Sequence, residues 1–145
     1  MGYKLRNVDV DDKLKIADVA EKCAPWIRNS VVGTYEFLAR CFRRYFFVIE
    51  DENGDLLGFI VGFPNIDVEG EFWLYQVAIL PEFRRNDLGS ILFDALKKKV
   101  VEDGYKVMKS HYRFDNEKSK NLHAKFGFKL DGTSDERGPF VICKL

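Results

Sequence analysis

The sequence predicts one α/β domain over residues 1–145, built on a mixed central β-sheet that is flanked by about four helices. Segments with a two-residue apolar period and segments with a helical apolar period follow one another in the order β-α-α-β-β-β-α-β-α-β-β. The length of 145 residues suits a single domain. No internal repeat, low-complexity tract or linker divides the chain, so all elements are expected to share one sheet.

The first half of the chain contains four predicted strands and two predicted helices. Residues 3–8 alternate as a strand, and residues 9–23 and 34–44 have helical spacing. The inward positions of these helices are expected to be Leu14, Ile16, Ala17, Val19, Ala20 and Cys23, then Tyr35, Leu38, Cys41 and Phe42. Asn53-Gly54 predicts a hairpin between two β-rich runs. Residues 71–80 are apolar on both faces apart from Glu71 and Gln76, which indicates a covered central strand.

The second half begins with a helix near Leu88, whose apolar stripe is followed by lysines at its negative end. A strand over residues 105–113, a short helix over 116–126 and strands over 127–132 and 140–145 complete the predicted domain.

Composition excludes several classes of partner. Lysine plus arginine number 23, as do aspartate plus glutamate, so the basic surface that long nucleic acids need is not expected. No apolar run reaches the length of a membrane span, and the first residues are too charged for a secretory leader. We therefore expect a cytoplasmic protein with no membrane or nucleic-acid partner. Cys23, Cys41 and Cys143 lack C-x-x-C spacing and are expected to be small buried residues, with no metal site.

The segment with the most chemistry is "VAILPEFRRNDLGS", residues 77–90, where a strand, a loop and a helix follow one another. A pyrophosphate needs converging backbone N–H groups and benefits from the positive end of a helix. The segment resembles the acetyl-CoA-binding loop of the GNAT superfamily of N-acetyltransferases, Q/R-x-x-G-x-G/A. Arg84 is then the leading arginine, Asp87 replaces the first glycine and Gly89 is the second.

A helix cap is the alternative explanation of this loop, because Asn86 or Asp87 would serve as an N-cap. The two explanations are compatible, since aspartate tolerates a positive φ better than most residues. In that case the carboxylate of Asp87 is expected to turn toward Arg84 or Arg85, away from the phosphates.

A second segment, "DNEKSKNLHAKFGF", is similar to the later GNAT pattern N-x-x-A-x-x-L-Y-x-x-x-G-F. Together the two segments imply a GNAT-like fold and acetyl-CoA as co-substrate, with no metal. The resemblance implies a coenzyme site formed by Val77, Ala78, Ile79, Arg84, Arg85, Asn86, Asp87, Leu88, Gly89, Ser90, Asn116 and Ser119.

The resemblance also implies direct transfer of an acetyl group to a primary amine. Backbone N–H groups near a bulge at Val77, Ala78 or Ile79 would stabilise charge on the thioester carbonyl. Glu71, with Asp67 and Glu69 before it, would attract the ammonium group and relay its proton. Tyr75 is a further catalytic candidate, although core packing is its expected role. His123 stands where the family places a tyrosine as the acid for the leaving thiolate.

Residues 33–63 and 72–79 are similar to diaminobutyrate acetyltransferases, but Ser30 and Val32 stand where acidic and asparagine residues are expected. We therefore predict a small amino compound as the acceptor, with Tyr35, Trp73 and Glu69 in its pocket. A protein lysine or N-terminal acetyltransferase is one alternative, and a non-catalytic acyl-CoA-binding or interaction domain is another. The resemblance is also consistent with a homodimer.

Overall fold

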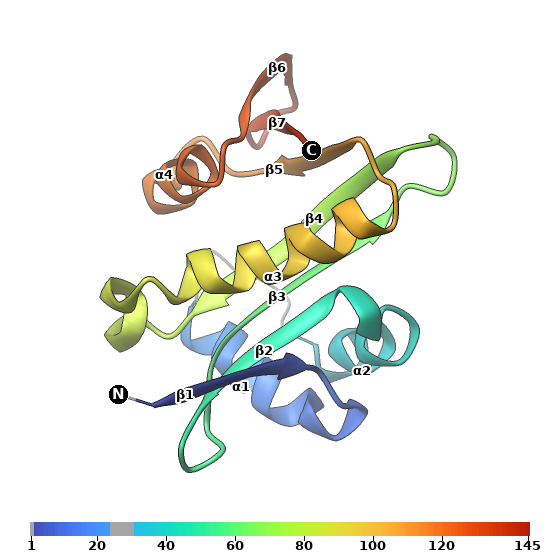
Figure 1. Cartoon of the computed structure of the whole chain (residues 1–145). Coiled ribbons are helices and arrows are strands. Elements are labelled where there is room, and N and C mark those ends of the chain that lie inside the picture. The colour runs from blue at the N-terminus through green and yellow to red at the C-terminus, as the bar shows by residue number, and fades with distance from the viewer. Residues whose placement is uncertain (1, 24–30) are drawn as a thin grey trace.

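A computed structural model describes residues 2–23 and 31–145, and its elements follow the predicted order (Figure 1). The strands are β1 (Tyr3–Asn7), β2 (Phe46–Asp51), β3 (Leu56–Pro64), β4 (Glu71–Ile79), β5 (Val107–His111), β6 (Lys129–Ser134) and β7 (Pro139–Lys144). The helices are α1 (Lys13–Lys22), α2 (Val32–Cys41), α3 (Leu88–Glu102) and α4 (Glu117–Lys125). Short 3-10 helices are η1 (Val10–Asp12), η2 (Arg43–Tyr45) and η3 (Pro81–Asn86).

The strands form one seven-stranded sheet in the order β1-β2-β3-β4-β5-β7-β6. Only β4 and β5 pair in parallel, so the predicted mixed sheet is confirmed. The predicted hairpin joins β2 and β3, and Gly54 takes a φ of 81° in its turn. Asp51 Oδ1 fixes the turn by accepting the N–H groups of Asn53 at 2.8 Å and Asp55 at 3.0 Å.

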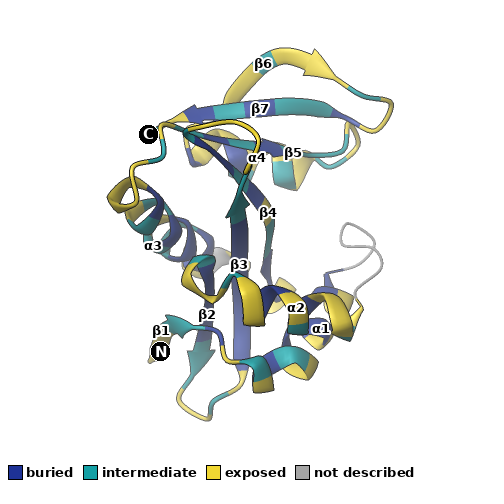
Figure 2. Cartoon of the chain, turned by 90° about the vertical axis from the view of Figure 1, so that its right-hand side faces the viewer, coloured by how far each residue is buried: buried dark blue, intermediate teal, exposed yellow. Residues whose placement is uncertain are grey.

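Helices cover both faces of the sheet, with α3 on one side and α1 and α2 on the other (Figure 2). Leu88, Leu92 and Leu96 of α3 are buried against the first face, as the apolar stripe predicts. Ile16 and Ala20 of α1 are fully buried in a second core on the opposite face. Within the described ranges, no helix is long and apolar enough to cross a membrane.

Three residues that the sequence assigns to the core lie at the surface instead. Leu14 is 66% exposed, because it lies on the side of α1 that faces away from Ile16 and Ala20. Cys41 is exposed at the end of α2, whereas Cys23 and Cys143 are buried as predicted. Tyr75 in β4 is 46% exposed, so that strand is not covered along its whole length.

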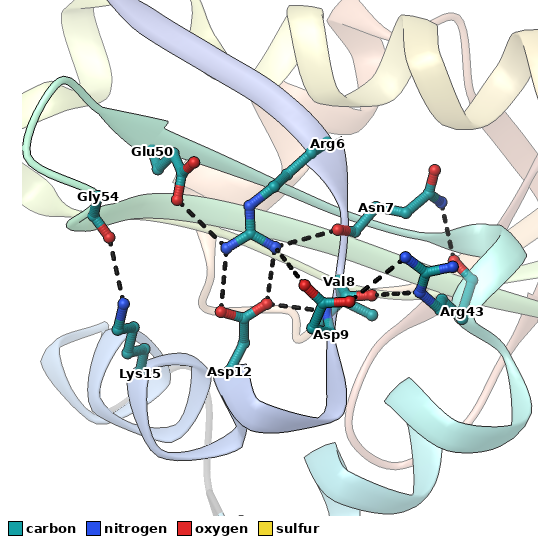
Figure 3. Close-up of polar contacts among 9 residues, drawn as sticks. All are labelled: Arg6, Asn7, Val8, Asp9, Asp12, Lys15, Arg43, Glu50 and Gly54. Carbon is teal, nitrogen blue, oxygen red and sulfur yellow. Dashed lines mark hydrogen bonds and ion pairs between the residues drawn. The ribbon is translucent and has the colours of Figure 1, made fainter.

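A charge cluster around Arg6 ties the first strand to its neighbours (Figure 3). Both oxygens of Asp12 accept hydrogen bonds from the Arg6 guanidinium, at 2.8 and 3.0 Å, and Glu50 accepts a third at 3.2 Å. Asp12 is buried and also accepts the N–H of Asp9 at 2.8 Å. The hydrogen bond with Asp12 is the main reason that the pKa of Arg6 is raised. The cluster thereby joins β1, η1 and β2.

Candidate active site

Strands β4 and β5 separate in the middle of the sheet. Their parallel pairing extends only over Glu71–Trp73 and Val107–Lys109, whereas β4 stays paired with β3 to Ile79. The register between β3 and β4 shifts at Val61 and Gly62, which leaves Tyr75 as an extra residue in β4. The predicted bulge is therefore present in this strand, at Tyr75, and it precedes Val77 to Ile79, where the backbone donors are predicted.

The unpaired half of β4 carries backbone groups that face away from β3. Leu80 N–H donates to Leu57 C=O at 2.9 Å, so by alternation Ala78 faces β3 as well. Val77 and Ile79 consequently present their N–H groups on the side where β5 is missing. Ile79 C=O on that side accepts Arg84 Nε at 3.1 Å. Of the three predicted backbone donors, Val77 and Ile79 have a suitable direction, and Ala78 does not.

Asp87 has the backbone conformation of the glycine that it replaces. Its φ of 61° and ψ of 21° are left-handed, and it is the one non-glycine residue with positive φ in the described part of the chain. Asp87 is the N-cap residue of α3, but its side chain makes no capping hydrogen bond. The helix-cap explanation is therefore confirmed for the position of Asp87 but not for a capping hydrogen bond, and Asn86 ends the preceding η3.

The carboxylate of Asp87 forms an ion pair with Lys125 Nζ of α4. The prediction that it would turn toward Arg84 is wrong, because Arg84 bonds the carbonyl of Ile79 instead. The side chain of Arg85 lies outside the described part of the structure. The hydrogen bond with Lys125 lowers the pKa of Asp87, so the loop carries an ionised carboxylate at neutral pH.

The N-terminus of α3 remains open to an anion. The first N–H groups of a helix have no partner within it, and here no side chain caps them. These groups belong to Leu88, Gly89 and Ser90, at the positive end of a 15-residue helix. Leu88 and Gly89 are buried, and Ser90 is partly exposed. An uncapped helix start directly behind an unpaired strand fits the pyrophosphate and the extended arm of a coenzyme A thioester.

His123, the predicted acid, is buried in the structure with an exposure of 4%. Its Nδ1 lies 2.7 Å from Ser119 C=O, and its Nε2 lies 2.8 Å from Ser110 Oγ. Burial lowers the pKa of the imidazole more than the bond to Ser119 raises it. Both ring nitrogens therefore have protein partners, which contradicts the open geometry that an acid for a departing thiolate needs.

Asn116 and Ser119, the predicted coenzyme residues of the second segment, organise the start of α4. Asn116 is the N-cap residue, and its Oδ1 accepts the N–H of Ser119 at 3.0 Å. Ser119 Oγ lies 3.2 Å from His123 Nδ1. These contacts give Asn116 and Ser119 structural roles that need no bound coenzyme.

Glu71, the predicted proton relay, is buried with an exposure of 7%. Its carboxylate accepts Asn65 Nδ2 at 2.6 Å and Trp73 Nε1 at 2.8 Å, and Lys109 Nζ pairs with it at 3.1 Å. Burial alone would raise the pKa of Glu71, but these three partners outweigh it and lower the pKa. The carboxylate is therefore a structural counter-ion of Lys109.

Asp67 and Glu69 lie in the exposed loop between β3 and β4. Figure 1 shows this loop at the opposite end of the strands from the start of α3. The loop is therefore far from the helix start that would hold phosphates, and the role of Asp67 and Glu69 toward the ammonium group stays a prediction.

Tyr35, predicted for the acceptor pocket, is a core residue with an exposure of 2%. Its hydroxyl donates to Gln76 Oε1 at 2.9 Å, and burial raises its pKa to about 12. Trp73 and Tyr75 differ, because both lie on the partly open face of the sheet. The Trp73 ring packs edge-on against Phe140 at 6.0 Å, and the Tyr75 ring lies 5.4 Å from Phe63. Val32 begins α2, and Ser30 lies outside the described residues.

His111 and Asp135 form a pair that the sequence did not indicate. His111 Nε2 lies 2.9 Å from Asp135 Oδ1 and 3.1 Å from Gly138 C=O. The two residues are 24 positions apart, and no motif connects them. Pairing of β5 with β7 brings the turn after β6 next to the end of β5, so only the folded chain joins them.

A strand that loses its partner, a left-handed turn and an uncapped helix start together form an arrangement suited to a phosphate-bearing ligand. The sequence profile of the acetyltransferase (GNAT) family matches residues 14–128, and the chain belongs to this family. The predicted family, fold and enzyme class are therefore confirmed.

The relatives include diaminobutyrate acetyltransferases. The L-2,4-diaminobutyric acid acetyltransferase of Chromohalobacter salexigens is 26% identical over 141 residues, which cover 97% of this chain and 73% of that protein. The enzyme of the same name from Vibrio parahaemolyticus is 26% identical over 133 residues, covering 92% and 70% respectively.

Solved structures share the fold at lower identity. EctA from Paenibacillus lautus, in complex with L-2,4-diaminobutyric acid and coenzyme A, has a TM-score of 0.86 at 18% identity and covers 99% of this chain and 95% of that chain. Ard1 from Thermoplasma volcanium also has a TM-score of 0.86, at 21% identity, and covers 100% and 99%.

Proposed function

We propose that the protein transfers the acetyl group of acetyl-CoA to the primary amine of a small amino compound. The observation that carries this proposal is the uncapped N-terminus of α3, which lies directly behind the half of β4 that β5 leaves unpaired. The left-handed turn at Asp87 makes this arrangement possible, because it directs the chain into the helix without a capping side chain.

The residues that would hold acetyl-CoA come from the loop and from the unpaired strand. The N–H groups of Leu88, Gly89 and Ser90 would bind the pyrophosphate. The N–H groups of Val77 and Ile79 would face the thioester carbonyl and stabilise the negative charge that develops on its oxygen. Bound acetyl-CoA supplies the acetyl group and a thiolate as the leaving group.

The face of the sheet opposite α3 carries aromatic side chains, and these favour a small amine as the acceptor. Phe63, Tyr75, Trp73 and Phe140 are partly or largely exposed on the face of the sheet opposite α3. An ammonium group gains about 0.5–2 kcal/mol from the face of an aromatic ring. The names of the relatives support a diamine such as 2,4-diaminobutyrate as the first compound to test.

Two measurements test the proposal in sequence. Calorimetric titration with acetyl-CoA is expected to give micromolar binding, with free CoA as the comparison. Release of free thiol is then followed with 2,4-diaminobutyrate, other short diamines, a peptide with a free N-terminus and a peptide lysine. Turnover with the small amines but not with the peptides is the expected result.

Each other result favours a different function. Preference for a peptide would replace the small amine with a protein acceptor. Binding of acetyl-CoA without turnover of any amine would indicate a non-catalytic coenzyme-binding domain. Absence of binding at millimolar acetyl-CoA would overturn the proposed function altogether.

A further inference from the structure

We propose that His111 accepts the proton of the acceptor ammonium group, and that Asp135 and Gly138 are positioning residues for its ring. This inference rests on the proposed function, and it replaces Glu71 as the residue that takes the proton of the ammonium group. It comes from geometry that only the folded chain displays, namely a polar pair at the place where β4 and β5 part.

The contacts of His111 determine which of its nitrogens carries the proton. Gly138 C=O can only accept a hydrogen bond, and it lies 3.1 Å from Nε2. Asp135 Oδ1 lies 2.9 Å from the same nitrogen. Nε2 must therefore be the N–H donor in the neutral ring, which leaves the lone pair on Nδ1. No described residue hydrogen-bonds to Nδ1, and the side chain is 20% exposed.

Asp135 is held in its ionised form, as a positioning carboxylate must be. Burial opposes its ionisation, but the hydrogen bond with His111 and the N–H groups of Arg137 and Gly138 outweigh burial and lower its pKa. The backbone N–H groups lie 2.9 and 3.0 Å from Oδ1. The carboxylate can therefore stabilise the imidazolium that forms when Nδ1 takes a proton.

His111 lies beside the unpaired half of β4. The parallel register sets Trp73 opposite Lys109, so continuing it by two residues would set Tyr75 opposite His111. Alternation along β5 puts His111 on the same face as Lys109, whereas Ser110 faces α3. The His111 ring lies 4.8 Å from the ring of Phe140, which also contacts Trp73. The imidazole thus borders the aromatic surface that the amine is proposed to occupy.

The titratable groups near His111 lie on the turn between β6 and β7, on β5 itself, on β4 and on α4. Arg137 Nη2 lies 3.4 Å from Asp135 Oδ2, on the turn between β6 and β7. Lys109 on β5 is neutralised by Glu71 of β4 at 3.1 Å. His123 of α4 lies on the other side of β5, buried and bonded to Ser110. Asp135 is therefore the carboxylate in direct contact with the ring, and it favours uptake of a proton.

The proton and electron balance of the step is simple. One N–H bond of the ammonium group breaks, and the proton forms a new N–H bond at Nδ1, which leaves a lone pair on the amine nitrogen. That pair forms the amide C–N bond, while the thioester C–S bond breaks and its electrons leave with sulfur. The second ammonium proton goes to the thiolate, and His111 returns its own proton to solvent.

The kinetic test compares His111→Gln and Asp135→Asn with the wild type across pH. Glutamine preserves an N–H donor for Asp135 but does not titrate, and general base catalysis contributes about 10²–10⁴-fold. We expect kcat to fall by about 100-fold in His111→Gln at neutral pH, with acetyl-CoA affinity changed less than about twofold. Asp131→Asn is the matched control, because that carboxylate lies on the same hairpin and bonds Thr133 instead.

The shape of the profile distinguishes a base from a structural residue. In the wild type, kcat/KM should rise with pH through one ionisation, as expected for a general base. In His111→Gln the rise should move toward the pKa of the free amine, about 10.4 for a lysine-like group. Asp135→Asn should move this rise in kcat/KM to lower pH, because the imidazolium form of His111 loses its carboxylate partner. An unchanged profile in His111→Gln, in an enzyme that still turns over, would overturn the role of His111 alone.

Nitrogen NMR of the protein without coenzyme supplies a readout that does not depend on turnover. The neutral His111 ring should show a protonated Nε2 and an unprotonated Nδ1. Asp135→Asn should weaken this preference, whereas Asp131→Asn should leave it unchanged. A protonated Nδ1 in the neutral wild-type ring would overturn the inference, even if acetyl-CoA binds and amines are acetylated.

Discussion

His123 Nε2 lies 2.8 Å from Ser110 Oγ, directly behind the point where pairing between β4 and β5 ends. Because Nδ1 lies 2.7 Å from a carbonyl, that of Ser119, Nδ1 donates and Nε2 accepts the Ser110 hydroxyl proton. Ser110 Oγ also lies 3.4 Å from Leu74 C=O. A neutral histidine of α4 therefore accepts the one hydroxyl proton of Ser110, which is then not donated to the Leu74 carbonyl of β4.

This buried histidine should make the stability of the protein depend on pH. Burial lowers the folded-state pKa of His123, so below the ordinary value of about 6.5 the unfolded chain binds a proton that the folded ring excludes. The free energy of unfolding should therefore fall as the pH decreases from 6.5, by at most about 1.4 kcal/mol per pH unit. Urea unfolding of the wild type and His123→Phe at several pH values measures it. The variant should be less stable at pH 7.5, with a smaller loss on acidification. Equal pH dependence in the two proteins would show that the folded ring takes up a proton as readily as the unfolded one.

Asp87→Gly should bind acetyl-CoA more tightly than the wild type. Glycine adopts the left-handed conformation without strain, and the substitution removes a negative charge and releases Lys125 for the phosphates. Since both side chains are exposed, we expect a gain of only about two- to fivefold in affinity, which should decrease at high salt. Asp87→Asn is the matched variant, because it removes the charge but retains a residue that tolerates positive φ. Weaker binding by both variants would mean that the Asp87–Lys125 pair organises the loop.

Asp12→Asn should destabilise the N-terminal part of the fold by roughly 1.5–3 kcal/mol, because the buried hydrogen bonds of Arg6 lose their charged partner. The hydrogen bonds from Arg6 and from Asp9 N–H together outweigh burial and lower the pKa of Asp12. Its contribution is thus complete above about pH 4 and is lost as the pH falls through the lowered value. Denaturant unfolding at pH 7 and below pH 4 tests both statements. Asp9→Asn is the control, because Asp9 is exposed and should change stability by about 0.5 kcal/mol or less (Figure 3).

Glu71→Gln should reduce stability without changing the acidic limb of the pH–rate profile. The substitution leaves Lys109 without its anionic partner and weakens the bonds from Asn65 and Trp73, which together are worth roughly 1.5–3 kcal/mol. Thermal unfolding measures the first effect, and kcat/KM against pH measures the second. Loss of the acidic limb in this variant would restore Glu71 as the proton relay.

Local sequence determined the features that depend on neighbouring residues. The apolar periods gave the order of all eleven helices and strands, and Asn53-Gly54 gave the hairpin. The strand–loop–helix segment with Gly89 and Asp87 indicated the family together with the later segment over residues 115–128, because turns and helix starts are formed by consecutive residues. The left-handed conformation of Asp87 follows from its position at the first glycine of the motif, and aspartate tolerates it.

Only the tertiary structure decided which side chains can take part in catalysis. His123 occupies the motif position, yet packing buries it against Ser110, and Glu71 is neutralised by Lys109 from another strand. His111 had no motif, and it acquires Asp135 only because β7 pairs with β5. The physical reason is that solvation and hydrogen-bond partners set the protonation state of a side chain. Those partners come from distant parts of the chain, so the pattern of nearby residues does not contain them.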